Sequence, residues 1–234
     1  KTTFLKLLMG EYEYRGQIRS SVGFEYFPYP VAHPEASAME AAKEVIAPFA
    51  HWEREMGRLC GRTDEASLAA YGEAMEQYLL HDGYIIEEAI RKEASRLEVK
   101  EEALGRPFGT LSCGEQTKVL LAALFLKKNR FLLLDEPTKG LDPFAKEELG
   151  AAFQEWTAQG KCLVLVTHDI EFSARYAHRC AFLFDGGIVS QEAPDLFFTT
   201  NQFYTTAACK MSRGILDGAV TGEEVIRCAS GADR

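Results

Sequence analysis

The sequence lacks any apolar run of the about 18 residues that a membrane-spanning helix requires. Charged residues interrupt its longest apolar stretches, so we expect no membrane span. Basic residues are outnumbered, with 26 Lys and Arg against 35 Asp and Glu and a formal net charge of -9. This balance argues against binding nucleic acid through bulk positive charge, although a local basic face is compatible with it. We expect no direct DNA binding.

Cysteine is present, but not in the patterns that form metal sites or disulfide frameworks. None of the six cysteines forms a C-x-x-C pair, and no Cys/His group has zinc spacing. Cys162 and Cys180 lie in apolar runs, which favours buried, reduced thiols. A reducing compartment fits this use of cysteine, and we expect a cytoplasmic protein.

Apolar strands and helices alternate in the second half of the chain. From residue 105 onward, the stretches "RFLLLDE" and "KCLVLVTHD" have the composition of strands, and a helical pattern follows each of them. The stretch "CAFLFDGGIVSQ" predicts a hairpin about Gly186 and Gly187. This order predicts an α/β fold with a mostly parallel sheet that helices cover on both faces.

The first half begins with a predicted helix and strands and then becomes helical. The stretch "KTTFLKLLMG" has helical spacing. Strands that end at Pro28 and Pro30 are suggested by Ile18, Val22, Phe24, Tyr26 and Phe27. Residues 36–103 are rich in Ala, Glu, Arg and Leu at helical spacing. Because apolar residues recur throughout this region, we expect an inserted helical subdomain and not a linker.

Polar residues follow the two predicted strands directly. Asp135 and Glu136 come after "FLLL", and Thr167, His168 and Asp169 come after "CLVLV". Ligands of parallel α/β sheets bind at the carboxyl ends of the strands, so these side chains are expected to share a site. One acid can hold Mg²⁺ and its neighbour can orient or deprotonate a water molecule. Taken alone, however, an acid pair is better explained as a solvated strand end.

The first residues of the chain also favour a phosphate-binding site. Lys1, Thr2 and Thr3 precede an amphipathic helix, as the end of a G-x-x-x-x-G-K-[ST] loop does. In that loop the Lys reaches the phosphates, the hydroxyl binds Mg²⁺ and the helix N-terminus supplies amides. We expect a fragment whose preceding strand and glycine turn are missing, and we expect the fold of a P-loop NTPase.

The stretch "LSCGEQTKVLLAALFLKKNRFLLLDEPTKGLD" closely resembles the ATP-binding cassette (ABC) family. "LSCGEQ" is similar to the family signature, with Cys113 in place of a Gly, and "FLLLDE" is similar to Walker B. "KGLD" and "VTHD" are similar to the D-loop and the H-loop. These motifs follow in the family's order and spacing, which makes a chance match implausible.

The resemblance implies an ATPase that binds and hydrolyses ATP with Mg²⁺ in a head-to-tail dimer with a second nucleotide-binding domain. It implies a cassette domain over residues 1–192, incomplete at its N-terminus, with a helical subdomain over about 31–128 and a C-terminal extension over 193–234. The aromatic residue that stacks on adenine is expected upstream. Tyr29 stands where the family's Q-loop Gln is expected, so a contact of that Gln with Mg²⁺ and water is in doubt.

The resemblance also carries roles to single residues. Glu136 would be the general base or water-orienting group, His168 would contact the γ-phosphate, and Asp142 would couple the two sites of the dimer. Ser112 and Gly114, before a helix that is expected to start near Glu115, would form an anion site. The implied nucleotide-binding residues are Lys1, Thr2, Thr3, Ser112, Cys113, Gly114, Glu115 and Asp142, and the implied metal ligands are Thr2 and Asp135.

The two parts of the chain resemble different branches of the family. Residues 1 to about 132, with "FEYFPY" and "HWEREMGRL", resemble the ABC-F proteins that act at the ribosome. Residues from about 133, with "DEPTKGLDP" and "THDIEFSARYAHRC", resemble ATPase subunits of energy-coupling factor import transporters. The chain end favours the second branch and a membrane transporter subunit as partner, which implies a peripheral position on the inner face of the cell membrane. The ribosome is the alternative partner, and an inactive fragment without P-loop glycines is the third hypothesis.

Overall fold

The computed structural model describes residues 1–201, 204–216 and 218–230 of the chain. Its centre is a three-stranded parallel sheet in the order β1 (Glu25–Phe27), β2 (Phe131–Asp135) and β3 (Cys162–Val166). In β2, the three leucines over 132–134 are buried. The predicted α/β class is confirmed, because both parallel strand pairs join segments that helices separate along the chain.

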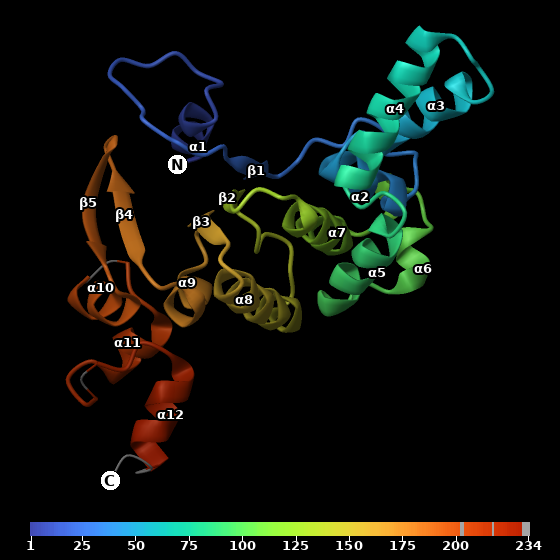
Figure 1. The fold of residues 1–234 in the computed structure, drawn as a ribbon. Helices are drawn as coiled ribbons and strands as arrows, with labels where there is room; N and C mark the ends of the chain where they lie inside the picture. Colours follow the sequence, from blue (N-terminus) through green and yellow to red (C-terminus); the bar gives the residue numbers. More distant parts are fainter. Residues whose placement is uncertain (202–203, 217, 231–234) are drawn as a thin grey trace.

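Three helices lie against this sheet (Figure 1). Helix α7 (Cys113–Leu126) contacts β1, helix α8 (Pro143–Ala158) contacts β3, and α1 (Thr2–Leu8) contacts β2. Trp156 of α8 is 1% exposed and stacks on Phe125 of α7, with ring centroids 4.6 Å apart. Nζ of Lys161 donates to the backbone oxygens of Lys127 and Asn129 at 2.7 and 2.9 Å. The end of α7 is therefore tied to the loop that precedes β3.

The region 36–103, which was predicted to be helical, consists of helices of 4 to 16 residues. They are α2 (Ala38–Ile46), α3 (Phe49–Leu59), α4 (Glu65–Leu80), α5 (Ile86–Arg96) and α6 (Glu101–Leu104). Helices α3 and α4 pack as a pair, whereas α2 and α5 pack on α7. Asp64 caps α4 by accepting from the amide of Ser67 at 3.0 Å. Figure 1 shows this region at the opposite end of the molecule from the C-terminal helices.

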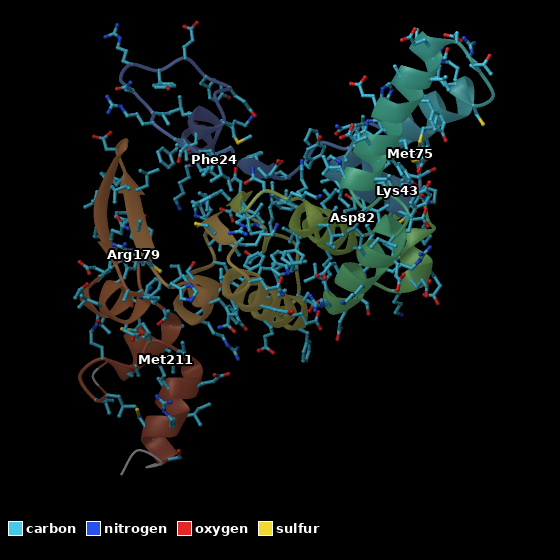
Figure 2. The ribbon with its side chains drawn as sticks, viewed as in Figure 1. Phe24, Lys43, Met75, Asp82, Arg179 and Met211 are labelled. Carbon is cyan, nitrogen blue, oxygen red and sulfur yellow. The ribbon has the colours of Figure 1, made fainter. Side chains whose placement is uncertain are left out.

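The remaining chain forms a hairpin and short helices around a second apolar cluster. Helix α9 (Ile170–Tyr176) leads to the predicted hairpin, β4 (Cys180–Phe184) and β5 (Gly187–Glu192). Helices α10 (Pro194–Thr200), α11 (Ala207–Ser212) and α12 (Gly222–Ser230) follow. In Figure 2, Arg179 lies at the base of the hairpin and Met211 lies on α11, where it is 81% exposed.

Two expectations about local structure are wrong. Ile18 and Val22 lie outside any strand and are exposed, because β1 pairs with β2 only over its three residues. Cys162 is exposed, because β3 pairs with β2 alone among the described residues and one of its faces is open. Cys180 is buried as expected, and the six cysteines are free in the described part of the chain.

No helix in residues 1–201, 204–216 and 218–230 combines the length and the apolar character needed to cross a membrane.

Candidate functional site

The first acid of the site is the last residue of β2. Asp135 follows three buried leucines, and the hydroxyl of Tyr26 on the neighbouring strand β1 donates to its Oδ2 at 3.0 Å. Its Oδ1 is buried and has no hydrogen-bond partner among the described residues. Burial, the hydrogen bond with Asp135 and the charge of that carboxylate together raise the pKa of Tyr26 to about 12. The Tyr26 hydroxyl therefore stays protonated and remains a donor at neutral pH.

The second acid has an unusual backbone conformation. Glu136 has a φ of +51°, in the left-handed region that few residues other than glycine adopt. Its amide donates to the carbonyl of Val166 in β3 at 2.7 Å. This turn directs the carboxylate toward the end of β3, where Thr167 Oγ1 and the amide of His168 donate to Oε2 at 3.4 and 3.3 Å. Strained backbone of this kind concentrates at functional sites.

The ends of β2 and β3 therefore bring Glu136, Thr167 and His168 close together. Nε2 of His168 lies 3.5 Å from Oε1 of Glu136, and the His168 side chain is 79% exposed. Asp169 caps α9 by accepting from the amide of Phe172 at 3.0 Å, and Nζ of Lys146 lies 2.6 Å from its carboxylate. His168 is therefore held through its backbone amide, while its largely exposed ring lies beside the Glu136 carboxylate.

The predicted anion site lies at the N-terminus of helix α7, which starts at Cys113, two residues before the expected start near Glu115. Ser112 caps this helix, and its hydroxyl accepts from the amide of Glu115 at 3.2 Å. The Glu115 carboxylate in turn accepts from the amide and the hydroxyl of Ser112, both at 2.8 Å. The hydrogen bond from the Ser112 amide is the main cause that lowers the pKa of Glu115, and the hydrogen bond with the Ser112 hydroxyl lowers it further. The hydroxyl predicted to meet phosphate is thus already bonded within the chain.

The predicted D-loop packs on this helix start. A β-carbon on Gly140 would lie 3.4 Å from Sγ of Cys113, and one on Gly114 would lie 3.4 Å from Cδ2 of Leu141. Gly140 has a φ of +78°, which suits glycine. Asp142 caps α8 by accepting from the amide of Ala145 at 2.9 Å. The structure thus brings together Cys113, Gly114 and the segment before Asp142.

The first residues of the chain are not joined to the two acids. Lys1, Thr2 and Thr3 are exposed at the start of α1, and no hydrogen bond or ion pair of the described residues links them to Asp135 or Glu136. Within the described residues, no group of three or more His, Cys, Asp or Glu side chains has a metal-binding arrangement. A metal ion would therefore need ligands beyond the carboxylates of this chain, such as phosphate oxygens or water.

Two tyrosines were missed or only partly understood from the sequence. Tyr26 was expected in a strand, but the sequence gave no signal for its bond to Asp135, because the two residues lie 109 positions apart in the chain. Tyr29, at the expected Gln position, is half-buried, with Nζ of Lys127 5.4 Å from its ring centroid. It lines a pocket of about 380 Å³ together with Phe27, Cys113 and Gln116, among others. The end of β1 and the start of α7 therefore share one pocket.

Comparison with known proteins identifies the family. The profile of the family described as "ABC transporter" matches residues 1–139, which is more than half of the chain. The chain belongs to the ABC transporter family. The predicted ATP-binding cassette is thereby confirmed, whereas the division into an ABC-F part and an energy-coupling factor part stays a prediction.

Relatives of this ABC protein include a putative ABC transporter ATP-binding protein from Bacillus thuringiensis, 46% identical over 114 residues, 49% of this chain and 21% of that protein. An energy-coupling factor transporter ATP-binding protein from Oenococcus oeni is 32% identical over 123 residues, 50% of this chain and 43% of that protein. The chain thus spans about a fifth of the length of the first of these relatives and less than half of the second.

Solved structures of this family share the fold. A nucleotide-free ATP-binding cassette from an ABC transporter superposes with a TM-score of 0.56 at 15% identity, covering 82% of this chain and 75% of that chain. A complex of an archaeal ribosome recycling factor with a ribosomal stalk protein superposes with a TM-score of 0.50 at 17% identity, covering 85% of this chain and 31% of that chain. The fold is therefore that of P-loop ABC cassettes, and it does not by itself distinguish transport from ribosomal roles.

Proposed function

We propose that this chain is part of an ATPase that hydrolyses MgATP between two nucleotide-binding domains and energises a membrane import transporter. The observation that carries the proposal is the shared end of β2 and β3, where Nε2 of His168 lies 3.5 Å from the Glu136 carboxylate beside Asp135. In the proposed division, residues 1–192 form the cassette with a helical subdomain over about 31–128. Residues 193–234 form the extension, of which residues 202–203, 217 and 231–234 lie outside the described part.

Asp135 fits Mg²⁺ because its Oδ1 is buried and has no partner in the part of the chain that the structure describes. Thr2 would be a second ligand, and Lys1 and Thr3 would bind phosphate, once α1 lies beside the acids. When bound, Mg²⁺ neutralises charge on the phosphate oxygens of ATP. A carboxylate at the end of a rigid, buried strand keeps its position during this binding, which limits the entropy lost.

Glu136 is suited to orient the attacking water and accept its proton. The water oxygen forms a bond to the γ-phosphorus while the bond from that phosphorus to the oxygen of ADP breaks. Thr167 and the amide of His168 donate to Oε2, so Oε1, which lies 3.5 Å from Nε2 of His168, would be the oxygen that accepts from the water. The exposed imidazole of His168 would contact the γ-phosphate from the same side.

Ser112, Cys113, Gly114 and Glu115 would bind the nucleotide held by the second domain. The N-terminus of α7 favours negative charge, and the Glu115 carboxylate accepts there from the amide and the hydroxyl of Ser112. A γ-phosphate would therefore displace the Glu115 carboxylate from the hydroxyl of Ser112. Asp142, the N-cap residue of α8, follows Gly140 by two positions and would link the two sites.

The name of the energy-coupling factor protein above supports a transport role. Import is supported by the name of a hemin import ATP-binding protein from Streptomyces coelicolor, 38% identical over 112 residues. In this role the helical subdomain would contact a membrane subunit, and the protein would be cytoplasmic and peripheral at the inner membrane face. A ribosomal partner is the alternative. Sedimentation of the full-length protein with transporter-containing membranes, and not with ribosomes, is the expected result.

The test of the ATPase uses the full-length gene product and the substitution Glu136→Gln. We expect phosphate release to fall at least about 100-fold and ATP-bound dimers to accumulate in gel filtration. Glu147→Gln is the matched control, because Glu147 is an exposed acid of α8 that pairs with Arg175 at 3.0 Å. Unchanged phosphate release in Glu136→Gln would remove Glu136 from its role, and no release from the wild type would favour an inactive protein.

A further inference from the structure

We propose that Tyr26 is a positioning residue of the metal site, whose hydroxyl holds Oδ2 of Asp135 so that Oδ1 is presented to Mg²⁺. This inference rests on the proposed function, because it requires Asp135 to bind the metal. It adds a role for a residue of β1, which none of the cassette motifs in the sequence includes.

The register of the sheet explains how the two side chains meet. Tyr26 lies opposite Leu133 in the parallel pairing of β1 with β2. Side chains two residues apart in a strand share a face, so Asp135 follows Leu133 on the side that Tyr26 faces. The long tyrosine ring spans this diagonal step, and its hydroxyl reaches Oδ2 of Asp135 at 3.0 Å.

The hydrogen bonds of the carboxylate are unequal. Oδ2 accepts from the Tyr26 hydroxyl, whereas Oδ1 is buried without a partner among the described residues. A hydrogen bond to a charged acceptor is stronger than one between neutral groups and fixes the rotation of the carboxylate. A buried acceptor with no partner is costly unless a ligand completes it. The arrangement therefore leaves a single oxygen of Asp135 for a cation.

Tyr26 acts on one acid only. The Glu136 carboxylate takes its hydrogen bonds from Thr167 and His168 at the end of β3. Removing the Tyr26 hydroxyl should therefore change the affinity for the metal and leave the orientation of Glu136 unchanged. Groups that orient a metal ligand typically alter metal affinity by about 10- to 100-fold when they are removed.

The experiment titrates Mn²⁺ into the full-length protein in the presence of ADP and follows free Mn²⁺ by electron paramagnetic resonance. We expect Tyr26→Phe to weaken Mn²⁺ binding about 10-fold and to leave binding of metal-free ADP unchanged. Tyr78→Phe is the matched control, because Tyr78 also donates to a carboxylate, that of Glu53 at 3.4 Å, but lies in α4 of the helical region. This control should bind Mn²⁺ as the wild type does.

A double variant separates a positioning role from a general structural one. In an Asp135→Asn background, which should itself lose Mn²⁺ affinity, Tyr26→Phe should cause no further loss. The positioning role would be overturned if Tyr26→Phe bound Mn²⁺ with wild-type affinity. It would also be overturned if Tyr26→Phe lowered the Mn²⁺ affinity equally in the wild-type and the Asp135→Asn backgrounds. Neither result would contradict the proposed ATPase. Unchanged affinity in Asp135→Asn would overturn both, because Asp135 would then not bind the metal.

Discussion

Sγ of Cys113 lies 3.4 Å from the point that a β-carbon on Gly140 would occupy. The start of α7 and the D-loop are therefore in contact within one chain. Cys113 stands where the family signature has a Gly, and Gly140 is the small residue opposite it. The two positions together leave room for the sulfur atom, and a longer side chain at position 140 would have to displace it.

The conformation of Gly140 gives the first prediction. Gly140→Ala should lower the free energy of unfolding by about 1 kcal/mol, because a φ of +78° strains any residue with a β-carbon. Gly160→Ala is the control: Gly160 has a φ of +88° and open space around it, so it should cost the same. Urea unfolding measures both. A Gly140→Ala variant as stable as the wild type would show that this turn relaxes.

Two helical glycines should respond in opposite ways to the same change. Gly72→Ala in α4 should stabilise the protein by about 0.5–1 kcal/mol, because alanine favours helix and nothing lies within 4 Å of the new methyl group. Gly150→Ala in α8 should destabilise it, because its methyl group would lie 2.3 Å from Cζ of Tyr176. Thermal unfolding measures the two shifts. If Tyr176→Ala does not abolish the penalty at Gly150, the ring is not its cause.

The buried tryptophan should contribute most to stability among the aromatic residues of α8. Trp156→Ala should cost about 3–5 kcal/mol, because it removes a fully buried ring that stacks on Phe125. Phe144→Ala, on the same helix, should change stability by less than about 0.5 kcal/mol, because Phe144 is 78% exposed. Equal effects in urea unfolding would contradict the packing described for α8.

Two helices share the same cap, which gives a matched pair of variants. Ser112→Ala in α7 and Ser37→Ala in α2 each remove a capping box and should each cost about 1 kcal/mol at pH 7. In the full-length protein, only Ser112→Ala should weaken ATP-driven dimerisation, which gel filtration with ATP would detect. If both variants dimerise normally, Ser112 has a structural role alone.

The cap of α7 should also depend on pH. The pKa of Glu115 is lowered from its ordinary value of 4.5, so its stabilising effect is fully present above 4.5 and disappears as the pH falls through the lower folded value. The stability difference between wild type and Ser112→Ala should therefore narrow in acid. Exposure to solvent keeps the effect small, so denaturant titrations at pH 7 and below pH 4.5 should be compared directly.

The sequence predicted the elements whose patterns are local. The run "FLLL" marks β2 because a strand buried on both faces is continuously apolar, and the expected sharing of a site by Glu136 and His168 follows from the parallel order of β2 and β3. Apolar composition alone misplaced Ile18, which has no neighbouring strand to pair with.

Contacts that depend on register could not be predicted from one sequence. The bond of Tyr26 to Asp135 and the contact of Cys113 with Gly140 each need the relative position of two distant segments. The capping box of Ser112 can be predicted from the sequence, since Glu115 follows Ser112 by three positions. Its consequence, that Glu115 accepts from the amide and the hydroxyl of Ser112 that are proposed to bind phosphate, could be found only in the structure.

Lys161 fixes the C-terminal end of helix α7. Its ammonium group donates to the carbonyl oxygens of Lys127 and Asn129, just beyond the last turn, while Ser112 caps the opposite end of the helix. A helix of 14 residues is about 21 Å long, so a tilt of about 10° around the gripped end would swing the first residue by roughly 4 Å. Small rotations of the surrounding helices would therefore displace Ser112 by several times more than they displace the end of α7 that is fixed beside the sheet.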